Sequence, residues 1–158
     1  TSGIVTNDRG VTVWLKGNRV SRNQIMAIKE ESVTEQKNSL AVCLDNILRH
    51  AGITRNTEYD LAQGKTATTI LSENMTGVQV LDLSGCTLDA VLYYVNQDIP
   101  VLAILEDGEA VLVTGFNEFN VVIMEPATGK LYKKGMNDAT AWFAENGNHF
   151  ITYMRIEN

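Results

Sequence analysis

The chain has 158 residues, of which 44% are hydrophobic and 20% charged, and its formal net charge is -6. This length and composition are typical of one globular domain rather than of a disordered or fibrous protein. The acidic balance argues against a nucleic-acid partner, because phosphate binding requires Lys and Arg gathered on one face. The longest apolar stretches, such as residues 100–105, are far shorter than the roughly 20 residues of a membrane-spanning helix. We therefore expect a packed domain with no nucleic-acid partner and no membrane span.

Residues 1–30 are extended and basic, and we separate them from a main domain at residues 31–158. The stretch GVTVWLKG at 10–17 alternates as a strand, GNR supplies a turn, and IMAIK at 25–29 is extended again. We expect an N-terminal arm or hairpin here, which could belong to a preceding domain. The chain begins at Thr1 without a signal peptide, so we expect a mature product or a segment of a larger protein.

A helix is predicted over residues 38–51 by its hydrophobic periodicity. Its apolar residues recur at helical spacing and form one continuous face: Leu40, Cys43, Leu44, Ile47, Leu48 and Ala51. Asn38 or Ser39 is suited to the N-cap, and Gly52 to the C-terminal stop.

The remaining pattern changes from helical to β near Pro100. We expect short helices at 56–64 and 65–74, a strand at 78–83 and a helix at 87–97. Strands follow at 100–107, 109–116, 120–126 and 130–135, then a helix at 137–146 and a strand at 149–156. The short connections between strands favour antiparallel pairing, and the whole order predicts an α+β fold.

Three segments in this order resemble the bacteriocin-processing (double-glycine) peptidase-like family of papain-like cysteine peptidases. They are SLAVCLDNILRHAG at 39–52, GEAVLVTGF at 108–116 and IMEP at 123–126, and the resemblance runs from about Gln36 to Tyr153. It implies a papain-like fold, in which an N-terminal core helix packs on an antiparallel sheet.

The resemblance also implies which residues stand at the catalytic positions. The family's Cys begins the helix, thirteen residues before a Gly, which matches Ser39 and Gly52. Glu109 takes the position of the catalytic His, and Glu125 that of the Asp. Gln36 is the candidate for the oxyanion-hole Gln, although it lies closer to Ser39 than the family spacing.

These replacements predict a loss of catalysis. Serine needs a positioned general base, and an ordinary glutamate is a much weaker base than histidine near neutral pH. Related degenerate domains in bacteriocin exporters recognise a peptide without cutting it. We therefore expect a binding or structural module of a larger, exported protein, extracellular or at the cell surface, with a peptide or a neighbouring domain as partner.

Other hypotheses remain open at this point. An active peptidase could use Ser39 with an acidic base, or Cys43 with His149 in a shifted frame. The domain could instead be architectural, with residues 1–24 docked to a preceding domain. Cys43 and Cys86 fit neither a disulfide framework nor a zinc motif, so we expect buried free thiols. We expect no metal and no cofactor, and the sequence gives no oligomeric state.

Overall fold

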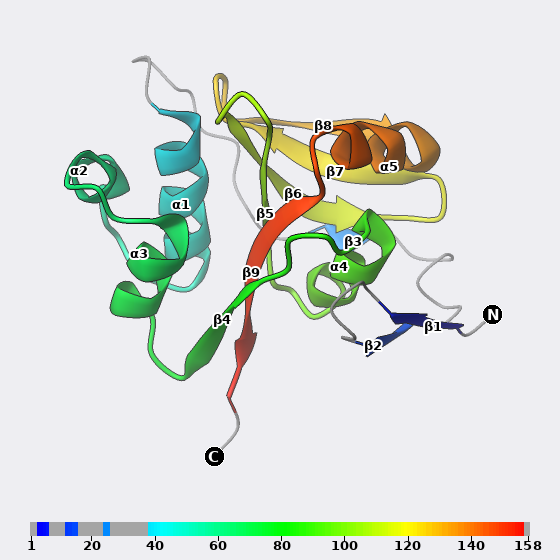
Figure 1. Cartoon of the computed structure of the whole chain (residues 1–158), viewed down its shortest axis with the longest axis horizontal. Coiled ribbons are helices and arrows are strands. Elements are labelled where there is room, and N and C mark those ends of the chain that lie inside the picture. The colour runs from blue at the N-terminus through cyan, green and yellow to red at the C-terminus, as the bar shows by residue number, and fades with distance from the viewer. Residues whose placement is uncertain (1–2, 7–11, 16–23, 26–37, 157–158) are drawn as a thin grey trace.

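A computed structural model describes residues 3–6, 12–15, 24–25 and 38–156 (Figure 1). Its first elements are strands β1 (Gly3–Thr6), β2 (Thr12–Leu15) and β3 (Gln24–Ile25), followed by helices α1 (Ser39–His50), α2 (Thr57–Ala62) and α3 (Ala67–Asn74). Strand β4 (Val78–Asp82), helix α4 (Leu88–Val95) and strands β5 (Val101–Ile104), β6 (Ala110–Phe116), β7 (Asn120–Glu125) and β8 (Lys130–Gly135) come next. Helix α5 (Met136–Glu145) and strand β9 (His149–Arg155) complete an α+β fold, as predicted.

Helix α1 begins and ends where its sequence predicts. The Asn38 side chain accepts a hydrogen bond from the Leu40 N–H at 2.9 Å, which caps the N-terminus. Gly52 has a φ of +87° and so provides the left-handed residue that follows the helix. Cys43 and Ile47 on the predicted apolar face are completely buried.

The described strands other than β1 and β2 form a seven-stranded sheet. The order along the sheet is β4-β9-β5-β6-β7-β8, and β3 pairs with β6 beside that path. All of these pairings are antiparallel, which confirms the prediction for the meander β5 to β8. The last strand of the chain, β9, lies between β4 and β5, a placement that the sequence pattern did not indicate.

The N-terminal arm contributes three short strands. β1 and β2 form an antiparallel hairpin that lies against α4, whereas β3 pairs with β6 through Gln24 and Ile25. β2 falls within the predicted strand at 10–17, and β1 was not predicted. Residues 26–29 of the predicted extended segment lie outside the described residues. The domain boundary after residue 30 stays a prediction.

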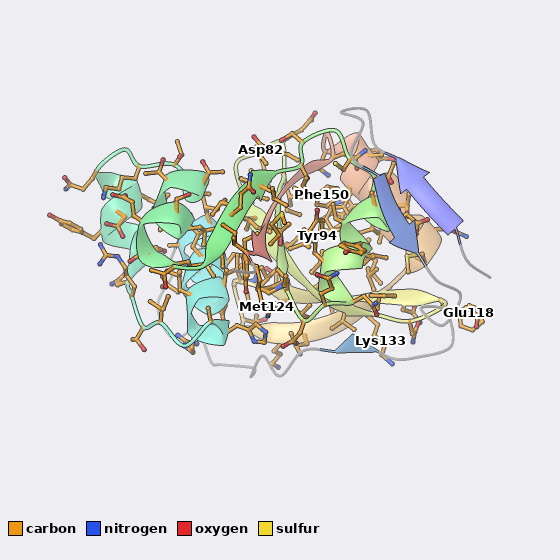
Figure 2. All side chains as sticks on the ribbon, turned by 90° about the horizontal axis from the view of Figure 1, so that it is seen from below. Asp82, Tyr94, Glu118, Met124, Lys133 and Phe150 are labelled. Atoms are coloured by element: carbon orange, nitrogen blue, oxygen red, sulfur yellow. The ribbon has the colours of Figure 1, made fainter. Side chains whose placement is uncertain are left out.

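Aromatic and aliphatic side chains from α1, α3, α4, α5 and the sheet form one core. Phe143 of α5 contacts Phe150 of β9 edge to face, with ring centroids 5.3 Å apart, and both side chains are buried. In Figure 2, Phe150, Tyr94 and Met124 lie within the body of the molecule, whereas Glu118 lies at its rim. No helix in the described part of the chain is long and apolar enough to cross a membrane.

Candidate functional site

The N-terminus of α1 meets the beginning of β6 through Ser39. The Ser39 Oγ accepts a hydrogen bond from the backbone N–H of Ala110 at 2.9 Å. Ala110 is only 1% exposed, so Ser39 provides the acceptor for a buried backbone donor. Ser39, the residue at the nucleophile's position, therefore connects α1 to β6 by a hydrogen bond to a residue 71 positions later in the chain.

Glu109 lies directly before this contact, at the end of a tight turn. Its backbone C=O accepts from the Leu105 N–H at 2.7 Å, and its own N–H donates to the Asp107 Oδ1 at 2.9 Å. These bonds hold the backbone, while the side chain of Glu109 is exposed to solvent.

Glu125 is the last residue of β7, on the strand next to β6. Met124 pairs with Leu112, so Glu125 lies one residue nearer to the beginning of β6. The Glu125 side chain is half-buried, and its Oε1 accepts from the Ala127 N–H at 3.2 Å. Its negative charge also contributes, after burial, to raising the pKa of the Tyr132 hydroxyl.

The structure thus brings Ser39, Glu109 and Glu125 to one end of the sheet. In the described part of the chain, no hydrogen bond joins these three side chains to one another. Gln36 lies outside the described residues, so its oxyanion-hole assignment remains a prediction. The roles of the other three positions also remain predictions.

Cys43 lies one turn further along α1 and is inaccessible to solvent. Its side chain is 0% exposed. Burial raises the pKa of the thiol far above its usual value, and the charge of Glu125 raises it further. A reactive cysteine needs an accessible, stabilised thiolate, and this environment provides neither. Cys86 is also a buried free thiol, as expected from the sequence.

The two histidines lie away from Ser39. His50 is at the other end of α1, about 16 Å along the helix axis at about 1.5 Å per residue, and its Nε2 lies 3.1 Å from the Asp98 carbonyl oxygen. His149 begins β9 in the row of Ile104 and Ala110. In the strand order β9-β5-β6, this row places the His149 backbone two strand spacings, or about 10 Å, from that of Ala110.

An acidic loop borders the Ser39 contact. Glu106, Asp107 and Glu109 are all exposed, and the Glu106 N–H donates to Asn146 Oδ1 at 3.1 Å, which fixes the loop to the end of α5. In residues 38–156, no cluster of three His, Cys, Asp or Glu side chains is arranged to hold a metal ion. The sequence predicted a strand at 100–107, but β5 ends at Ile104, and the loop at 106–109 was not identified as part of the site.

Comparisons with known proteins bear on the fold. No protein-family model and no curated protein matches the sequence. A solved structure from Bacillus anthracis, described as a "putative C39-like peptidase", superposes with a TM-score of 0.68 at 12% identity. The match covers 85% of this chain and 98% of that one. Similarity at this identity establishes the fold alone, and this chain therefore has a peptidase-like fold similar to that of the C39-like protein.

Proposed function

We propose that this chain is a papain-like peptidase domain that has lost its chemistry and binds a peptide or a neighbouring protein domain. The observation that carries the proposal is the hydrogen bond from the Ala110 N–H to the Ser39 Oγ. Through this hydrogen bond, the side chain at the nucleophile's position has a structural role. The proposal extends to export, with the domain outside the cell or on its surface.

Among the described residues, the surroundings of Ser39 offer no general base of suitable strength. A serine nucleophile must transfer its proton to a positioned base with a pKa near the working pH. The structure brings the acidic side chains of Glu109 and Glu125 to this end of the sheet, and a carboxylate is a much weaker general base than an imidazole near neutral pH. The chain has two histidines, and neither His50 nor His149 is placed beside Ser39.

The charge at this end of the sheet suggests the chemistry of the ligand. Glu106, Asp107 and Glu109 present three exposed carboxylates, whereas the half-buried Glu125 is paired with Lys130 across β7 and β8. Fixed charges of one sign attract ligands of the other sign and speed their encounter. We therefore propose that the preferred ligand is a segment rich in Lys or Arg.

Peptide digestion followed by mass spectrometry tests the loss of catalysis. The wild type, Ser39→Ala and Cys43→Ala are each incubated with a peptide library. No cleavage by any of the three is expected. Cleavage that disappears in Ser39→Ala would refute the proposal, and cleavage that disappears only in Cys43→Ala would establish the cysteine peptidase alternative.

Fluorescence anisotropy with labelled Lys-rich and Glu-rich peptides tests the binding role. We expect the Lys-rich peptide to bind more tightly and to weaken as salt rises, because exposed charges are screened over about 8 Å at physiological ionic strength. Glu106→Gln with Glu109→Gln should weaken binding. Glu118→Gln is the matched control, since Glu118 is exposed at the opposite end of β6, in the turn to β7. Equal binding of both peptides would refute the acidic-site assignment.

A further inference from the structure

Strand β8 forms one edge of the sheet, and part of its backbone is open to a further strand (Figure 1). The Met136 N–H donates to the Phe119 C=O at 2.7 Å, immediately beyond the last pair of the β7–β8 register. Hydrogen bonding alternates along an antiparallel strand, so the even-numbered residues from 130 to 136 bond to β7. The backbone N–H and C=O groups of residues 131, 133 and 135 therefore point away from β7. Among the described residues, β8 pairs with β7 alone.

β8 is also the most basic segment in the described part of the chain. Its sequence KLYKKG carries Lys130, Lys133 and Lys134 and no acidic residue. Lys130 and Lys133 are exposed, and none of the ion pairs within residues 38–156 includes a lysine of β8. The Lys134 Nζ lies 4.8 Å from the ring centroid of Trp142, a contact that leaves its positive charge in place. In Figure 2, Lys133 lies at the rim of the molecule. Positive charge thus accompanies the open backbone groups.

These lysines determine which kind of partner the edge favours. Lysine on an edge strand discourages pairing with another copy of the same strand. In a two-fold antiparallel arrangement about Tyr132, Lys130 would lie opposite Lys134 of a second copy, and like charges directly opposite each other are destabilising. Acidic side chains at the same positions of a partner strand would instead be attracted. The lysines therefore disfavour a second copy and favour an acidic segment.

The alternation of β8 fixes the order of residues that such a segment needs. Lys130, Tyr132 and Lys134 lie on one face of the sheet, and Leu131 and Lys133 lie on the other. Residues directly opposite each other in an antiparallel pair share a face and interact. A complementary strand, read from its own N-terminus, therefore has the order acidic, acidic, apolar, apolar, acidic. Its apolar residues lie opposite the half-buried Tyr132 and Leu131, and a uniformly Glu-rich segment lacks them.

We propose that β8 binds an extended acidic peptide segment, which adds to the sheet as a further antiparallel strand. Backbone hydrogen bonds to residues 131, 133 and 135 hold the segment, and its three carboxylates lie opposite Lys134, Lys133 and Lys130. In this mode of recognition the main chain provides affinity, and side chains that alternate between the two faces provide selectivity. The β8 edge is separate from the contact of Ser39 with β6, and binding there does not depend on the proposed function.

Fluorescence anisotropy with the purified full chain and a labelled peptide tests this binding. The probe contains the core Glu-Glu-Val-Val-Glu between threonines, and the control contains Val-Glu-Glu-Glu-Val, which has the same composition and charge. We expect a dissociation constant between about 10 μM and about 1 mM for the probe, because so short a strand buries less than a standard interface. The control places valine opposite Lys130 and Lys134 and should bind roughly 2–20-fold more weakly. Equal binding of the two peptides would overturn the proposal.

N-methylation of the probe separates strand addition from the attraction of charges alone. Methyl groups on the second and fourth core residues, opposite Lys133 and Leu131, remove the N–H groups that bond to β8 and should abolish binding. Methyl groups on the first and third core residues, opposite Lys134 and Tyr132, leave those bonds intact and should largely preserve binding. Similar affinities of the two methylated probes would contradict strand addition.

A charge exchange at Lys133 tests the register. Lys133→Glu should weaken binding of the probe roughly 3–20-fold, because it replaces an attraction by a repulsion. A probe with lysine as its second core residue should bind Lys133→Glu more tightly than the wild type. Lys65→Glu makes the same change of net charge between α2 and α3 and should leave binding unchanged. Lys133 is exposed, so the fold should survive, and circular dichroism checks it. Unweakened binding of the probe by Lys133→Glu would refute the assignment.

Discussion

Ser39→Ala provides the most direct test of the structural role of Ser39. The substitution removes the acceptor of the Ala110 N–H and leaves that donor, which is 1% exposed, without its partner. An unsatisfied buried donor costs about 1–3 kcal/mol. Alanine favours a helix over serine by roughly 0.5 kcal/mol, which offsets part of the loss. We therefore expect the free energy of unfolding to fall by about 0.5–2.5 kcal/mol.

Urea denaturation followed by far-ultraviolet circular dichroism measures this change. For a protein of this size, 1 kcal/mol corresponds to a Tm shift of about 2–4 °C, so thermal unfolding of Ser39→Ala should occur roughly 1–10 °C lower. Ser39→Thr keeps an oxygen acceptor and should lose less stability. If Ser39→Ala is as stable as the wild type, the hydrogen bond does not stabilise the fold, and the argument for a structural serine fails.

Three further predictions concern other parts of the molecule. Native Cys43 should resist alkylation at pH 8 and react only after unfolding, because burial raises its pKa and excludes reagent; rapid labelling of the native protein would contradict this. Hydrogen bonds from Arg55 at 2.8 and 2.9 Å hold the pKa of Asp60 below its usual value. The Asp60 carboxyl is therefore more acidic in the folded protein than in the unfolded chain. Its contribution to stability is therefore present above the unfolded pKa near 3.9 and disappears as pH falls through the folded value; Arg55→Ala should flatten this acid dependence in denaturation curves. The triple variant Ser39→Cys, Glu109→His and Glu125→Asp should gain thiol-dependent peptide cleavage, whereas Ser39→Cys alone should remain inactive; absence of cleavage by a folded triple variant would count against a papain-like arrangement of these positions.

Local sequence patterns accounted for most helices and strands because these elements depend on neighbouring residues. The helix predicted at 38–51 is α1, and the strand predicted at 109–116 is β6, each within one residue at either end. The helix predicted at 137–146 is α5, which begins one residue earlier at Met136. Hydrophobic spacing and turn residues carry this information, and none of it requires knowledge of distant contacts.

Pairings between strands that are distant in the sequence could not be predicted from local patterns. The position of β9 between β4 and β5, and the pairing of β3 with β6, depend on backbone hydrogen bonds that every non-proline residue can make. The Ser39 contact with Ala110 could not be predicted either, because its donor is a backbone N–H and nearly every residue type has one. The family resemblance placed Ser39 near Glu109, but only the structure shows what the hydroxyl contacts.

We propose that the helix end that would serve a cysteine nucleophile has a different use in this chain. The positive end of a helix dipole stabilises negative charge, and in a peptidase this favours the thiolate. Here Ser39 is neutral, and the acidic side chains at this end of the sheet are Glu106, Asp107, Glu109 and Glu125. Their charge has no imidazolium partner from His50 or His149. Under the proposed function this charge attracts a cationic ligand, whereas the Ser39 hydroxyl accepts the hydrogen bond from the Ala110 N–H.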